Sequence, residues 1–218
     1  DLESKASIAQ KISYDLAVWH EILTWYVPST FLIKERVSSF SPEDLFSNNI
    51  GGILGRQILV EMIRGNKQVS LEDYEKRVDD LIRQTVTEFG GMSAEKTYAA
   101  FKLTSGVWWN PAYHLPRFRA TLKREFTAYG DVPSHLAPGQ ETLGCSANVT
   151  AMTMPSPEAK CDEYYSLQIR PKNRVPVKKM LKGDRKLDNR TVSQADFPAM
   201  IQYIKANMEK KLGSGIGF

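Results

Sequence analysis

Cysteine and histidine are scarce in this chain of 218 residues, which contains two Cys and three His. A structural zinc site usually takes four closely spaced Cys or His ligands, so this scarcity nearly excludes one. The sequence also lacks a CxxC pair, an HExxH motif, a Walker loop and a GxGxxG turn. The usual sequence signatures of zinc proteases and of nucleotide or dinucleotide binding are therefore missing.

Charge of one sign and long apolar runs are lacking too. The 29 Lys and Arg residues against 25 Asp and Glu give a net charge of +4, too small to indicate nucleic-acid binding. No apolar run reaches the ~18 residues of a membrane span, and no signal peptide is visible. The chain begins at Asp1, directly before a helical pattern, so we expect a processed or truncated chain. The lack of a targeting segment therefore does not assign the protein to a cellular compartment.

What is present is the composition of a globular protein, with 42% hydrophobic and 25% charged residues. Apolar residues at helical spacing predict a first helix over about residues 7–27, ended by Pro28. Ser41 and Asp44 form a capping box that predicts a second helix to about residue 64. Capping and periodicity predict further helices over about 70–89, 94–103 and 198–212.

Glycine interrupts the second helix at Gly51, Gly52 and Gly55, and each glycine costs roughly 1 kcal/mol relative to Ala. We expect another backbone packed close against this stripe to offset the cost.

From residue 106 to about 195 the chain is rich in proline, with brief alternating runs at 121–126 and 164–169 that predict short strands. The predicted fold class is α+β, with a mainly helical core over about 1–105, a loop-rich, short-stranded second half and a C-terminal helix. Too few periodic apolar segments occur in the second half for an independent core, so residues 1–218 are predicted to form a single domain.

The strongest candidate site lies on the first helix at His20 and Glu21, with Thr24 one turn further on. This part of the helix is otherwise apolar, and a carboxylate buried there needs a partner, a proton, a metal or water. A His beside such a Glu is a common acid–base or ligand arrangement. The alternative is a satisfied core His and a Glu that bridges to an Arg of a neighbouring helix.

The start of the second helix adds Glu43, Asp44 and Asn48 to the candidates. Acidic residues are expected at a helix start for stability alone, because they complement the helix dipole. Asn48 and its neighbour Asn49 are poor helix formers, and they need hydrogen-bond partners if they face inward.

The strings AVWHEILTWY and SSFSPEDLFSNNIGG carry a family resemblance. They resemble a family of bacterial proteins classed as lipoproteins of unknown function, whose members have a His-Glu-Ile-x-Thr-Trp helix followed by Phe-Ser-Pro-Glu-Asp-Leu-Tyr-Ser-Asn. Phe46 stands where the family has Tyr. The two motifs cover about 40 residues.

The resemblance implies a location in the cell envelope or periplasm more firmly than it implies a reaction. It also implies an N-terminal section with a Gly-Phe-Ile-Asp stretch and a His-x-Arg motif. We therefore expect this chain to be the C-terminal part of a longer protein, with any lipid anchor and some partners of His20 and Glu21 outside it.

Three other features have both a functional and a structural interpretation. Trp108, in a predicted loop, could stack on a ligand, although such residues more often pin a loop to the core. The basic 170–190 stretch could bind an anionic envelope surface or be a solvated loop. Cys145 and Cys161 would form a disulfide in an oxidising compartment, which the resemblance favours, and remain two thiols in a reducing one.

Two functional hypotheses follow for the chain as a whole. In the first it is a hydrolase-like envelope protein that uses His20 and Glu21, with Thr24, Glu43, Asp44 and Asn48 in support. In the second it is a non-catalytic envelope or interaction module, and the same residues form a structural polar network. A catalytic site must be open to water, whereas a structural network is sealed. A divalent metal stays open as a cofactor, although ligand spacing does not support one, and the sequence indicates neither substrate nor any other cofactor.

Overall fold

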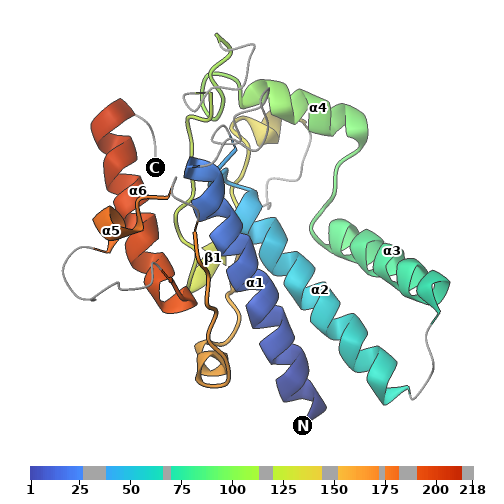
Figure 1. Ribbon diagram of the computed structural model, residues 1–218. Coiled ribbons are helices and arrows are strands. Elements are labelled where there is room, and N and C mark those ends of the chain that lie inside the picture. The colour runs from blue at the N-terminus through green and yellow to red at the C-terminus, as the bar shows by residue number, and fades with distance from the viewer. Residues whose placement is uncertain are drawn as a thin grey trace.

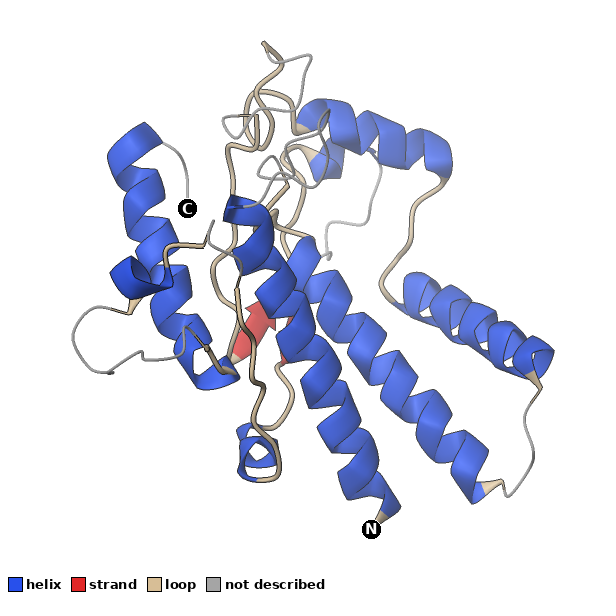
Figure 2. Cartoon of the chain, in the orientation of Figure 1, coloured by secondary structure: helices blue, strands red, loops and turns tan. Residues whose placement is uncertain are grey.

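The computed structural model describes residues 1–26, 38–65, 70–112, 120–143, 152–171, 175–181 and 191–212. Helices dominate the described chain and a small antiparallel sheet accompanies them (Figure 2), which confirms the predicted α+β class with a C-terminal helix. The helices are α1 (Leu2–Tyr26), α2 (Asp44–Arg64), α3 (Leu71–Glu88), α4 (Ala94–Leu103), α5 (Val177–Met180) and α6 (Phe197–Leu212). The remaining elements are strands β1 (Asp131–Pro133) and β2 (Thr153–Pro155) and the 3-10 helices η2 (Gln140–Leu143), η3 (Ala159–Glu163) and η4 (Gln194–Asp196).

Helices α1 and α2 run antiparallel, side by side (Figure 1). Gln10 lies beside Gly52 in the middle of the pair, and Arg64 at the end of α2 bonds to Glu3 at the start of α1. The predicted helix ends agree with the observed ones within a few residues, apart from the start of α1. Ser70 caps α3 as predicted, since its hydroxyl accepts the Asp73 N–H at 3.1 Å.

The start of α2 differs from the prediction. The helix begins at Asp44, and its N-cap is Glu43, whose side chain makes no capping hydrogen bond. Ser41 does not cap: its hydroxyl donates to the Asp44 carboxylate at 2.7 Å. The reason is that residues 38–44 form successive turns, in which Ser41 N–H donates to Ser38 O and Asp44 N–H donates to Ser41 O. The α-helix therefore begins only at Asp44.

The strands predicted at 121–126 and 164–169 are wrong, and the observed strands lie at 131–133 and 153–155. The backbone of the first run bonds to two separate segments: Leu122 N–H donates to Trp108 O, and Glu125 N–H donates to Phe40 O. In the second run only Ile169 makes a bridge, to Val192. Alternating side chains predicted extended backbone, but a ladder also needs one continuous partner strand.

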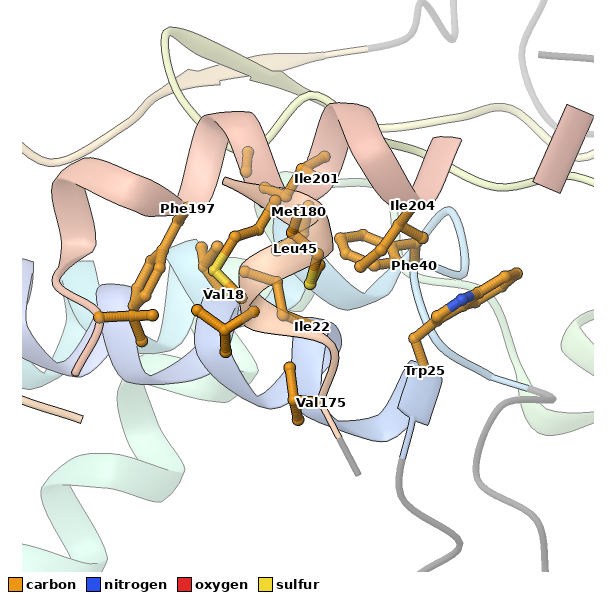
Figure 3. Close-up of a cluster of buried hydrophobic side chains, with 14 of the residues drawn as sticks. Val18, Ile22, Trp25, Phe40, Leu45, Val175, Met180, Phe197, Ile201 and Ile204 are labelled. Carbon is orange, nitrogen blue, oxygen red and sulfur yellow. The ribbon is translucent and has the colours of Figure 1, made fainter. Parts of the chain in front are cut away.

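The hydrophobic core lies between α1, α6 and the start of α2 (Figure 3). Val18 and Ile22 of α1 are fully buried and meet residues of α6 such as Phe197 and Ile204. The Trp19 ring stacks on the Phe197 ring with their centroids 5.8 Å apart. The short helix α5 closes this core with Val177 and Met180.

Helices α3 and α4 lie to the side of this core (Figure 1). The apolar face of α3 is buried at Leu81, but Leu71 is 72% exposed and Val86 is 51% exposed. Within the described residues, none of the helices combines the length and the apolar character needed to cross a membrane.

A core substitution on α1 tests this packing. We expect Ile22→Ala to lower the free energy of unfolding by about 2–5 kcal/mol, because the fully buried side chain leaves a cavity against α6. Leu16→Ala, at a position 48% exposed on the same helix, is the control and should change it by less than about 0.5 kcal/mol. Urea denaturation followed by circular dichroism measures both, and equal losses would contradict the assignment of this core.

Candidate functional site

The carboxyl group of Glu21 lies inside the protein, against the turn that precedes α2. Glu21 is 4% exposed, and its Oε2 accepts the backbone N–H of Phe40 at 2.6 Å. Phe40 has a φ of 57°, in the left-handed region that residues other than glycine rarely adopt. Such a conformation costs about 1–3 kcal/mol and persists only where surrounding contacts hold it. The Glu21 carboxyl is one of those contacts.

Asp44 and Arg124 set the electrostatics around Glu21. Burial and the nearby Asp44 carboxyl raise the pKa of Glu21 to about 8, although the Phe40 N–H and the Arg124 guanidinium act in the opposite direction. Arg124 is 2% exposed, and burial lowers its pKa to about 10. Its guanidinium lies 5.3 Å from the centre of the Trp25 ring and donates to the carbonyl of Ser39. At neutral pH the Glu21 carboxyl therefore retains its proton.

Hydroxyl groups complete the arrangement. Thr24 Oγ1 and Ser39 Oγ share a hydrogen bond of 2.7 Å, and both residues are buried. The Ser41 hydroxyl lies 2.7 Å from Asp44 Oδ2 and 2.9 Å from Glu43 Oε1, so Glu43 touches the edge of the group from an exposed position. We name the buried group the Glu21 cluster; its members are Glu21, Thr24, Ser39, Phe40, Ser41, Asp44 and Arg124.

The structure separates His20 from this cluster. One residue along a helix turns the side chain by about 100°, and His20 is exposed while Glu21 is buried. The arrangement of His20 beside a buried carboxylate is thus not formed.

His135 has such a partner instead: its Nε2 lies 2.9 Å from Glu125 Oε2. Although burial opposes it, hydrogen bonds from His135 and Thr127 lower the pKa of Glu125 to about 2.

Asn48 lies apart from the Glu21 cluster, in a groove between α1 and α2. The groove has a volume of about 580 Å³. The predicted close backbone contact is observed at one position of the glycine stripe: a Cβ at Gly52 would lie 3.2 Å from the Gln10 side chain and 3.9 Å from the Gln10 carbonyl oxygen. At Gly51 and Gly55 the prediction is wrong, because a Cβ there would have nothing within 4 Å. Those two glycines leave space at the groove.

The remaining predicted residues lie elsewhere. Trp108 is half-buried, with the Lys123 ammonium 5.8 Å from its ring centre. Cys161 is buried, and Cys145 lies outside the described residues, so their disulfide stays a prediction. Of the basic 170–190 stretch, the structure describes only Arg170, Lys178 and Lys179 among the cations.

A second buried polar group was not predicted. Asp15, fully buried on α1, accepts the Tyr129 hydroxyl at 3.0 Å and the Tyr165 hydroxyl at 2.5 Å. Its Oδ2 also lies 2.7 Å from the Lys11 ammonium, which reaches Asp162 at 3.1 Å. Burial is the main reason that the pKa of Tyr129 and of Tyr165 is raised, and the Asp15 carboxylate adds to it. The i, i+4 spacing of Lys11 and Asp15 is the one sequence feature that could have indicated this polar group.

No metal centre is formed by the described part of the chain. None of its His, Cys, Asp and Glu side chains gather in a group of three or more that could hold an ion.

Comparison with known families matches residues 2–137 to the family described as "Protein of unknown function (DUF4056)". The match covers α1 to α4 and both sequence motifs. Neither the curated proteins nor the solved structures gave a match to the chain.

The raised pKa of Glu21 predicts a pH-dependent stability. The folded chain holds this proton up to a pKa of about 8, whereas an unfolded Glu releases it near 4.5. The folded state therefore binds more protons in this window, so stability is greatest below pH 4.5 as far as Glu21 is concerned and falls as the pH rises to about 8. Glu21→Gln should remove this fall.

The measurement is urea unfolding at several pH values between 5 and 8.5, with Glu163→Gln, at an exposed position, as the matched control. The control should keep the slope of the wild type. A Glu21→Gln variant with the same slope as wild type would contradict the protonated state of Glu21.

Proposed function

The chain belongs to the DUF4056 family of unknown function, and we propose that it is a non-catalytic binding module of the cell envelope. The Glu21 cluster fixes the packing of its helices, and the groove between α1 and α2 is its binding surface. The observation that carries this proposal is the burial of Glu21, which is 4% exposed and bonded to the Phe40 N–H. A catalytic group has to meet its substrate, and a carboxyl in this position meets only protein.

The hydrogen bonds of the Glu21 cluster support a structural role. Glu21 reaches Phe40, and Arg124 reaches Ser39 and Trp25, so α1, the turn before α2 and the segment at 124 are joined through buried polar contacts. Buried polar contacts of this kind help to fix a single arrangement of the elements around them. The exposed His20 takes no part in the network.

The groove supports a binding role. Its volume of about 580 Å³ is within the range of small-molecule sites, which span roughly 300–1,000 Å³. Its lining combines apolar side chains with a few polar ones, as binding sites generally do. The envelope location rests on the resemblance of the two motifs, and the basic side chains of Arg170, Lys178 and Lys179 fit contact with an anionic envelope surface.

One observation favours a hydrolase as the second candidate. The pKa of Glu21 is raised to about 8 beside the Asp44 carboxyl, and paired carboxyls with separated pKa values are common among general acids and bases. In that case a segment that opens the Glu21 cluster to substrate is required.

Paired substitutions at His20 and Glu21 separate the two candidates. If Glu21 is structural, Glu21→Ala should lower the free energy of unfolding by about 1–3 kcal/mol, because the buried Phe40 N–H loses its acceptor. His20→Ala, at an exposed position, should change it by less than about 0.5 kcal/mol. Thermal and urea unfolding, with and without divalent metal, measure both.

The same variants are assayed with nitrophenyl esters, phosphates and glycosides. We expect no turnover above the solvent rate for wild type or variants. Turnover by wild type that disappears in His20→Ala, at unchanged melting temperature, would overturn the non-catalytic proposal and establish the hydrolase.

A further inference from the structure

The groove between α1 and α2 is kept open by missing side chains. Glycine within a helix costs about 0.5–1 kcal/mol relative to Ala. At Gly51 and Gly55 nothing in the described structure lies within 4 Å of where a Cβ would be, so packing does not require glycine there. The space itself is what these two positions provide.

A buried amide faces that space without a partner. Gln10 lines the groove and is 9% exposed, yet its side chain makes no hydrogen bond to any described residue. Its amide atoms are not among the buried side-chain atoms that lack a partner, so they reach water in the groove and offer a donor and an acceptor there. Gln10 can therefore hydrogen-bond to a ligand inside the groove.

The groove has a polar end and an apolar end. Because α1 and α2 run antiparallel with Gln10 beside Gly52, Ser13 of α1 lies toward Asn48 of α2. In the opposite direction, Ala6 lies toward Met62. The apolar end is completed by Leu59 and by Tyr74 from α3; the polar end also includes Ser47.

Arg56 gives the groove its charge. It is the only charged side chain among the described residues that line the groove, and it makes no ion pair with a described carboxylate within 4.0 Å. An arginine bordered by amides and hydroxyls is suited to carboxylate or phosphate oxygens, which it can bind through two parallel N–H groups.

We propose that this groove binds a single-chain anionic amphiphile, whose headgroup oxygens contact Arg56 and the Gln10 amide and whose apolar chain lies over Leu59 and Met62. The inference rests on the proposed function, that the chain is a binding module and not an enzyme. A carboxylate and a phosphate headgroup share the required chemistry.

Calorimetric titration of the full chain tests the proposal, with dodecanoate and dodecyl phosphate below their micellar concentrations as probes. Dodecanol supplies the same chain without the charge. We expect both anions to bind, and dodecanol to bind at least roughly tenfold more weakly, the loss typical of one hydrogen bond to a charged group.

Three variants locate the binding. Gly51→Leu fills the groove and should abolish binding. Arg56→Gln should lower the affinity for both anions roughly tenfold or more and leave the affinity for dodecanol unchanged. Arg83→Gln, at an arginine whose side chain is 79% exposed on α3, is the matched control and should bind as wild type does. Circular dichroism and the melting temperature check that each variant folds.

Each contrary result overturns the proposal. These results are no binding of either anion by wild type, binding that Gly51→Leu leaves intact, and equal affinity for dodecanol. Self-association of wild type that Gly51→Leu abolishes, without amphiphile binding, would assign the groove to a second copy of the chain. Failure of this kind leaves the non-catalytic part of the proposed function standing, because only turnover that disappears in His20→Ala overturns that part.

Discussion

Two acidic residues of α1, Asp15 and Glu21, lie inside the protein, and the need to satisfy their carboxyl groups constrains how the rest of the chain packs. Asp15 is fully buried and Glu21 is 4% exposed. A buried carboxylate without a partner costs several kcal/mol, which is a large part of the stability of an ordinary domain. Each acid therefore holds partners that lie far from α1 in the sequence. Tyr129 and Tyr165 bond to Asp15, and Phe40 bonds to Glu21.

These contacts explain how a second half with little regular structure takes one conformation. Between α4 and α6, the described chain has two strands of three residues each, so few backbone ladders hold it. Side chains supply the missing connections: the Tyr14 hydroxyl donates to the Ala128 carbonyl at 2.7 Å, and Gln194 donates to the Tyr165 carbonyl at 3.1 Å. The loops are fixed to α1 by polar contacts at defined points, while α6 adds apolar contacts to the core through residues such as Phe197 and Ile204.

The helices were predictable because their signals are local. Periodicity and caps such as Ser70 and the Ser193–Asp196 box lie within a few residues of the helix they begin. The strands were not, since pairing of 131–133 with 153–155 depends on contacts across the sheet that alternation within one run does not encode. Of the residues singled out from the sequence, Glu21, Thr24 and Asp44 lie together because two adjacent helices carry them. Arg124 and the left-handed Phe40 join them through the tertiary fold alone, which no local signal encodes.

The separation of His20 from Glu21 follows from the same physics. Neighbouring helical residues face about 100° apart, so a helix with one face in the core cannot bury both side chains unless a second element covers the adjacent face. Glu21 faces the turn before α2 and Arg124, and among the described residues no element covers His20. The groove lies further along the same α2-facing side of α1, at Gln10 and Ser13, about two to three turns before Glu21. The Glu21 cluster and the groove therefore occupy different turns of one helix, and a ligand in the groove need not disturb the buried carboxyl groups on which the fold depends.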